Sequence, residues 1–248
     1  MTRELLTMAY IRCLWALKSM ISSGCASLDK LLGGGFPIGG TSLIYGEAET
    51  GKTVLAMQSA VNVSRRGHKT IFVDSDCTFS PTRLSQIAYY DFNEIAPRIV
   101  LVRPTSFQEQ SAVIDSLDEY LTKEIQLVVV DTINSFYRVE LGSPKETFAL
   151  NRELTRQVAC LTQISKTYDV AIFMISQVRS VLTEDRGNAS MEPVATRGLK
   201  FWSDIVINLK KAPQTRVIRA ILEKSPKHRY PVSCYFTIGR TGIRDQNQ

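Results

Sequence analysis

The segment of sequence that decides the fold is the run Gly46-Glu47-Ala48-Glu49-Thr50-Gly51-Lys52-Thr53. It fits the P-loop pattern G-x-x-x-x-G-K-[ST], in which glycines let the backbone wrap closely enough to aim N–H groups at phosphate oxygens. In this pattern Lys52 reaches the β- and γ-phosphate oxygens, and the hydroxyl of Thr53 binds Mg²⁺. We therefore predict that all eight residues bind a nucleotide cofactor, with ATP and Mg²⁺ as the ligands.

The sequence on both sides of the P-loop has the context that the motif needs. Residues 41–45 form a short apolar run typical of a buried strand, and residues 52–66 have helical spacing. A helix that begins at the loop adds its positive N-terminus to the phosphate site. Further along, the apolar run 126–131 ends in Asp131, whose carboxylate can hold Mg²⁺ through water. Thr53 and Asp131 are therefore the predicted metal residues.

Apolar runs of strand length alternate with helical patterns through most of the chain. Three more strand-like runs occur at residues 70–74, 99–102 and 170–176, with helical patterns between them. Such β-α-β-α repeats predict a mainly parallel sheet flanked by helices. Near the C-terminus, strand-like runs follow one another with only turns between them, at 204–209, 216–222 and 233–238. We predict one α/β domain with a C-terminal antiparallel β extension.

Two local patterns predict helices. Ser80 followed by Pro81 is typical of a helix start, with a capping hydroxyl before a proline at the first helical position. A longer helix is expected where apolar residues recur at intervals of two to four and form one face. These residues are Phe148, Leu150, Leu154, Val158, Leu161 and Ile164. We interpret that face as core packing.

Composition excludes several classes of protein. The chain has 248 residues, of which 44% are hydrophobic and 22% charged, as expected of a globular protein with a substantial core. No charge-free apolar run reaches the roughly 18 residues of a membrane-spanning helix. Arg12 and Lys18 interrupt the apolar start of the chain, which argues against a signal peptide. The five cysteines include no Cys-x-x-Cys pair, so we expect a reducing, cytoplasmic location.

Positive charge is concentrated near the C-terminus. Residues 200–248 hold ten Lys and Arg against three acidic residues, whereas residues 1–199 hold twenty basic and twenty-one acidic residues. This asymmetry predicts a polyanionic partner at the C-terminal end of the chain. A solvated basic sheet edge is the alternative interpretation.

Four sequence blocks, in order, resemble the RecA/RadA recombinase superfamily, and within it a group of archaeal paralogues of RadA. They are a lead-in at 21–40 (ISSGCASLDKLLGGGFPIGG), 73–84 (VDSDCTFSPTRL), 131–138 (DTINSFYR) and 176–178 (SQV). The resemblance covers about residues 20–245 and implies a RecA-like P-loop core. It also implies the RadA recombinase or other repair proteins as partners, and a homodimer as a candidate assembly.

The resemblance implies roles for three more residues. Asp76 stands where the family has a water-activating Glu, and Arg83 where an arginine lies against the adenine. Gln177 stands where a glutamine senses the γ-phosphate. A strand-end acid, a helix-surface arginine and a buried amide are the corresponding structural alternatives. Since Asp76 is one methylene shorter than Glu, we expect at most a weak Mg²⁺-dependent ATPase.

Other departures from the family favour an accessory protein over a strand-exchanging recombinase. The chain contains no Phe-x-x-Ala, the motif that links RadA-type subunits, and only about 20 residues precede the core. The loop 179–200, with four basic and three acidic residues, is barely positive. We therefore expect the C-terminal strands and turns, and not this loop, to bind DNA, with single-stranded DNA favoured. The candidate residues are Lys210, Lys211, Arg216, Arg219, Lys224, Lys227 and Arg229.

Two domain-level questions follow from the resemblance. Residues 1–19 match nothing in the family, so they are either an additional helix or the product of a start codon assigned too early; we favour the second. Residues 20–248 are expected to form the RecA-like ATP-binding core.

The leading functional prediction is an ATP- and DNA-binding accessory protein of homologous recombination and DNA repair. The alternative is a KaiC-like ATPase or signalling switch that acts on protein partners.

Overall fold

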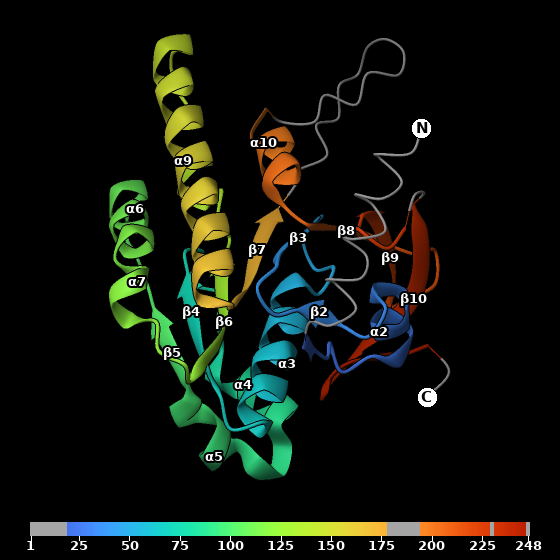
Figure 1. Cartoon of the computed structure of the whole chain (residues 1–248). Helices are drawn as coiled ribbons and strands as arrows, with labels where there is room; N and C mark the ends of the chain where they lie inside the picture. The colour runs from blue at the N-terminus through green and yellow to red at the C-terminus, as the bar shows by residue number, and fades with distance from the viewer. Residues whose placement is uncertain (1–18, 178–193, 229–230, 247–248) are drawn as a thin grey trace, which may run out of the picture.

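A nine-stranded sheet forms the centre of the structure (Figure 1), a computed structural model that describes residues 19–177, 194–228 and 231–246. The strand order is β11-β10-β9-β8-β3-β7-β6-β4-β5. The parallel strands are β3 (Thr41–Gly46), β4 (Lys69–Asp74), β5 (Ile99–Val102), β6 (Ile125–Asp131), β7 (Ala171–Gln177) and β8 (Ile205–Lys211). Beyond β8, successive antiparallel pairings add β9 (Val217–Lys224), β10 (Val232–Gly239) and β11 (Gly242–Asp245). The predicted fold class is confirmed.

Helices cover the two faces of the sheet. One face packs against α2 (Ala26–Leu32), α3 (Lys52–Arg65), α4 (Pro81–Ala88) and α5 (Phe92–Ile95). The other face packs against α6 (Phe107–Asp115), α7 (Leu117–Tyr120), α9 (Pro144–Tyr168) and α10 (Val194–Trp202). Short elements complete the described chain: the two-stranded sheet of β1 (Met20–Ile21) and β2 (Phe36–Pro37), α8 (Ser135–Val139), η1 (Tyr89–Asp91) and η2 (Ala96–Arg98). Among the described helices, none is long and apolar enough to cross a membrane.

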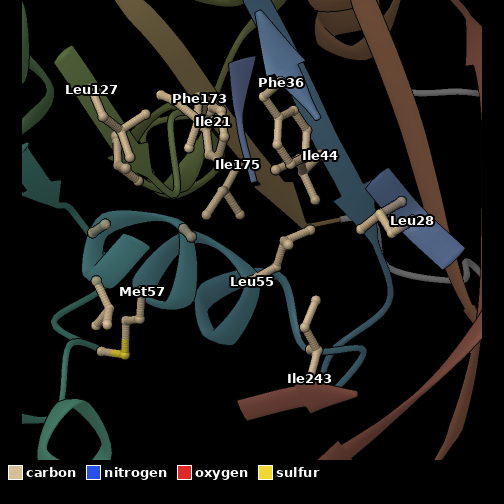
Figure 2. Packing of buried hydrophobic residues seen from close by; sticks show 14 of the residues in the cluster. Ile21, Leu28, Phe36, Ile44, Leu55, Met57, Leu127, Phe173, Ile175 and Ile243 are labelled. Carbon is tan, nitrogen blue, oxygen red and sulfur yellow. The ribbon is translucent and has the colours of Figure 1, made fainter. Parts of the chain in front are cut away.

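Alternation along the strands produces two separate core clusters. Ile44 lies in the cluster under α3, whereas its neighbour Leu43 lies in the cluster under α9, because successive strand residues point to opposite faces. Figure 2 shows the first cluster, where Leu55 of α3 points toward Ile44 and Ile175 of the sheet, whereas Met57 points to the other side of the helix. The rings of Phe36 and Phe173 meet there, with centroids 4.4 Å apart. These contacts fix α3, and hence the P-loop before it, on the sheet.

The helix predictions are mostly confirmed. Ser80 accepts a hydrogen bond from the N–H of Arg83 at 3.2 Å, and Pro81 follows at the first helical position. The prediction for Phe148 is wrong, because its side chain is 72% exposed. In α9 the fully buried stripe begins only at Leu154. The first turns of this helix project beyond the sheet (Figure 1), so no core lies beneath Phe148.

Candidate functional site

The predicted nucleotide residues come together at one edge of the sheet, which we call the P-loop edge. Parallel strands end at the same edge, and ligands of open α/β sheets bind there. Gly46, the last residue of β3, lies opposite Gln177 of β7 and Leu209 of β8. Asp131 ends β6 opposite Asp74 of β4. The register therefore gathers the P-loop, Asp131, Gln177 and the loop after β4 at one place.

Two glycines of the P-loop have positive φ angles and close neighbours, a backbone carbonyl at Gly46 and a side chain at Gly51. Gly46 has φ +153°, and a Cβ added there would lie 2.1 Å from the carbonyl oxygen of Leu209. Gly51 has φ +84°, and a Cβ there would lie 2.6 Å from Cδ1 of Ile238. A side chain at Gly46 would force β3 away from the backbone of β8, and one at Gly51 would displace the Ile238 side chain and strain the left-handed backbone. The residues present thus fit a loop that closes around phosphates.

Lys52 is held inside the P-loop. Its Nζ donates to the carbonyl oxygens of Gly46 at 3.0 Å and Glu47 at 2.6 Å, and the residue is only 8% exposed. Burial lowers the pKa of Lys52 to about 8, although the charges of Asp131 and Asp76 act in the opposite direction. The ammonium group is therefore preorganised against the loop, beside two carboxylates.

The side chains of the half-buried Thr53 and the buried Asp131 are hydrogen-bonded to each other. The hydroxyl of Thr53 donates to Oδ2 of Asp131 at 2.7 Å, and Asp131 is 1% exposed. Burial is the main cause that raises the pKa of Asp131 to about 6. Hydroxyl and carboxylate oxygens are the donors that Mg²⁺ prefers. The donor set at this position fits the predicted metal.

The loop after β4 places Asp76 at the same edge. Its carboxylate accepts a hydrogen bond from the hydroxyl of Ser135, the first residue of α8. The N–H of Ser75 donates to the carbonyl of Asp131 at 2.6 Å, so the loops after β4 and β6 are joined. Ser135 was not among the predicted site residues, although it lies in the family-like block 131–138. Its position four residues after the strand-end acid was the available signal.

Arg83 lies on α4 and contacts the turn between β10 and β11. Its guanidinium donates to the carbonyl oxygens of Gly239 and Arg240, each at 2.8 Å. Burial lowers the pKa of this guanidinium. Ile238, next in the chain, is the residue that approaches Gly51. The predicted adenine-side arginine thus borders the P-loop through this turn.

The predicted DNA-binding residues do not form a single surface. Strands β8–β11, which we call the C-terminal meander, carry the first group on the sheet face away from α2. There Lys210 lies directly opposite Arg219, and Arg219 lies opposite Tyr235. All three side chains are exposed, Tyr235 by 41%. Arg219 donates to the hydroxyl of Ser233, and among the described residues neither Lys210 nor Arg219 has an acidic partner.

Lys211 and Arg216 lie beside the P-loop. Nζ of Lys211 pairs with Oε2 of Glu49 in the P-loop at 2.9 Å. This ion pair lowers the pKa of the Glu49 carboxylate. Arg216 is exposed in the β8–β9 turn with φ +63°. Together with Ile238, these residues border a cavity of about 420 Å³. The turn therefore connects the meander to the P-loop edge.

Lys224 and Lys227 lie at the opposite edge of the sheet, near the start of β8. Nζ of Lys224 donates to the carbonyl oxygens of Lys200 at 3.1 Å and Phe201 at 2.9 Å, in the last turn of α10. Nζ of Lys227 donates to the carbonyl of Gly33, the residue that ends α2, at 2.8 Å. Both cations thus satisfy helix C-termini. Arg229 lies outside the described residues.

The fold and the P-loop edge define a P-loop protein with a RecA-like core. The model of the Rad51 family matches residues 17–246. The chain belongs to the Rad51 family. This result confirms the predicted membership of the RecA/RadA superfamily.

Similar proteins carry a more specific name. The chain is 37% identical over 232 residues to a "DNA repair and recombination protein RadB" of Thermococcus gammatolerans, with 91% of this chain and 99% of that protein covered. It is 32% identical over 228 residues to the protein of that name in Methanococcoides burtonii, with 92% and 99% covered. A solved structure, "Crystal structure of the RadB recombinase", matches with a TM-score of 0.78 at 34% identity and covers 91% of this chain and 99% of that one. The KaiC-like alternative has no support in these matches.

Proposed function

We propose that this chain is an accessory protein of homologous recombination and DNA repair that binds Mg²⁺–ATP and DNA. The observation that carries the proposal is the hydrogen bond between Thr53 and the buried Asp131, beside a P-loop whose carbonyls hold Lys52, in a Rad51-family chain. The names of the RadB relatives support the recombination role. Equilibrium dialysis with radiolabelled ATP, with and without Mg²⁺, tests the nucleotide part. Absence of Mg²⁺-dependent ATP binding would refute it.

Each residue of the P-loop edge has a role in this proposal. Backbone N–H groups of residues 46–53 surround the phosphates, and Lys52 turns from its loop carbonyls to the β- and γ-phosphate oxygens. Thr53 and Asp131 hold the Mg²⁺, which neutralises phosphate charge. Gln177 lies beside Gly46 and senses the terminal phosphate. Arg83 and the turn that it contacts border the adenine.

Hydrolysis is proposed to be weak. A general base must lie within hydrogen-bond reach of the attacking water, and Asp76 is shorter than the family's Glu. Its carboxylate is also engaged by the Ser135 hydroxyl. Asp76→Glu should therefore raise ATP turnover, measured as phosphate release with and without DNA. A wild-type rate near that of typical enzymes, about 10 per second, would contradict an impaired base.

DNA binding is proposed for the exposed meander face that carries Lys210 and Arg219. Like charges directly opposite each other on a sheet are destabilising, and a bound phosphate backbone relieves that repulsion. Arg216, exposed in the β8–β9 turn, extends the positive surface toward the P-loop edge, where Lys211 is paired with Glu49. Tyr235, in line with the two cations, offers a ring on which a base can stack, which favours single strands. Fluorescence anisotropy with single- and double-stranded oligonucleotides tests this preference.

The remaining predictions concern organisation and partners. We propose residues 20–248 as one RecA-like core and residues 1–19 as an extension outside it. A cytoplasmic location, a homodimer and association with the RadA recombinase complete the proposal. Deletion of residues 1–19 should leave the melting temperature and ATP affinity unchanged. Light scattering of the purified chain, alone and with RadA, tests both assemblies.

A further inference from the structure

Arg138 lies on the side of α8 that faces the P-loop edge. Residues three apart on a helix are neighbours on one face, so Arg138 shares a face with Ser135. The Ser135 hydroxyl contacts Asp76, and this contact turns that face of α8 toward the P-loop edge. Arg138 therefore shares the face of α8 that contacts Asp76.

The guanidinium of Arg138 contains a polar atom without a partner. Its Nε is buried and makes no hydrogen bond, and among the described residues Arg138 forms no ion pair. A guanidinium stays charged at any physiological pH, and a buried charged donor without a partner is costly. Its planar donors match the oxygens of a phosphate group. The unsatisfied donor thus indicates an anionic ligand.

The surroundings of Arg138 identify which anion fits. Burial is the main cause of the low pKa of Lys52, and the positive charge of Arg138 lowers it further, so the two cations lie within electrostatic range. Two neighbouring cations, beside the metal residues Thr53 and Asp131, are suited to a highly charged phosphate chain. The α- and β-phosphates are expected at the P-loop backbone. The proposed function assigns Asp76 to the attacking water, which must lie in line with the γ-phosphate.

We propose that Arg138 is a ligand of the terminal phosphate and makes the site prefer a nucleoside triphosphate to a diphosphate. The assignment rests on the proposed nucleotide binding at the P-loop edge. It would add a cation from α8 to the Lys52 ammonium at the terminal phosphate. Because the diphosphate lacks that group, Arg138 contributes to triphosphate binding alone.

Isothermal titration calorimetry with Mg²⁺–ATPγS and Mg²⁺–ADP tests the assignment. Arg138→Ala should weaken ATPγS binding by roughly 10- to 100-fold and ADP binding by less than about twofold, as expected for loss of a hydrogen-bonded charged group. Arg138→Lys, which keeps the charge, should retain part of the preference. Arg98→Ala is the matched control, since Arg98 is bound to the carbonyl of Gly67 at the other end of the strands. Equal melting temperatures show that the variants are folded.

Each of the following outcomes overturns the assignment. An equal loss of affinity for both nucleotides assigns Arg138 to the shared phosphates or to the fold. An unchanged nucleotide preference with weaker DNA binding in anisotropy assigns it to a DNA phosphate. A wild-type chain that binds neither nucleotide overturns the proposed function together with this assignment, whereas wild-type binding with an unchanged ratio in Arg138→Ala overturns the assignment alone.

Discussion

The P-loop edge and the C-terminal meander present their charges in opposite ways. At the P-loop edge, Lys52 and Asp131 are buried and held by short hydrogen bonds. On the meander, Lys210 and Arg219 are exposed, lie opposite each other and have no acidic partner among the described residues. A compact ligand needs groups fixed in advance at defined positions, whereas a polyanion needs only a local excess of charge. Substitutions at the P-loop edge should therefore affect nucleotide affinity strongly, whereas substitutions on the meander should have smaller effects on DNA affinity and on stability.

The meander itself contains a second contrast. Lys224 and Lys227 belong to the same basic segment, yet each donates to carbonyl oxygens at the end of a helix. Their charge complements helix dipoles, while that of Lys210 and Arg219 faces solvent. Cations that are close in sequence are thus placed by the fold in two different environments, at helix ends and on an exposed strand face.

The largest expected effect is at Gly46, where the two regions touch. Gly46→Ala places a Cβ 2.1 Å from the carbonyl of Leu209, so β3 and β8 must separate. We expect a loss of about 3–5 kcal/mol in the free energy of unfolding, measured by urea denaturation. Gly67→Ala is the control, because nothing lies within 4 Å of its added Cβ and only backbone strain of about 1–2 kcal/mol remains. Similar losses in both variants would contradict the close contact.

The next largest effect concerns the P-loop edge alone. Lys52→Ala removes the ammonium that the proposal assigns to the phosphates, and ATP affinity should fall by about 3 kcal/mol, roughly 100-fold. Equilibrium dialysis measures it, with circular dichroism to verify folding. Lys69→Ala is the matched control at the other edge, where Lys69 pairs with Glu124 on the surface. Wild-type ATP affinity in Lys52→Ala would exclude this P-loop from nucleotide binding.

A smaller effect separates the helix-bound cations from the exposed pair. Lys224→Ala and Lys227→Ala each remove a cation from a helix C-terminus, so each should lower the free energy of unfolding by about 0.5–1 kcal/mol. DNA affinity, measured by anisotropy at fixed salt, should stay within about twofold of wild type. A large loss of DNA binding with unchanged stability would move both residues to the DNA surface.

The smallest effect tests the repulsion on the meander. Lys210→Glu replaces a pair of like charges by an opposite pair with Arg219, and should raise the free energy of unfolding by about 0.5 kcal/mol. Lys210→Ala, which only removes the repulsion, should give an intermediate value. Chemical denaturation at low salt resolves the series. If Lys210→Glu is less stable than wild type, the two cations do not oppose each other as described.

The sequence predicted the fold and the P-loop edge well, because both depend on local patterns. Strand and helix periodicities determine the layers, and the strand-end position of Asp131 follows from parallel packing. The separation of the basic residues was not predictable, since it depends on strand register, including the irregularity between Val206 and Ile207. Phe148 is exposed because α9 extends beyond the edge of the sheet, which its own periodicity does not reveal. The Ser135–Asp76 contact joins residues 59 positions apart in the chain, so no local pattern predicts it.

The salt dependence of single-stranded DNA binding tests most directly the claim that nucleotide and DNA occupy different regions. Wild type and the double variant Lys210→Ala/Arg219→Ala are compared by anisotropy across a salt series near 0.1 M. Each phosphate contact contributes about 0.7 to the slope of log affinity against log salt, so the account predicts a slope shallower by about 1.4 and unchanged ATP affinity. An unchanged slope, with full DNA affinity in the double variant, would contradict it.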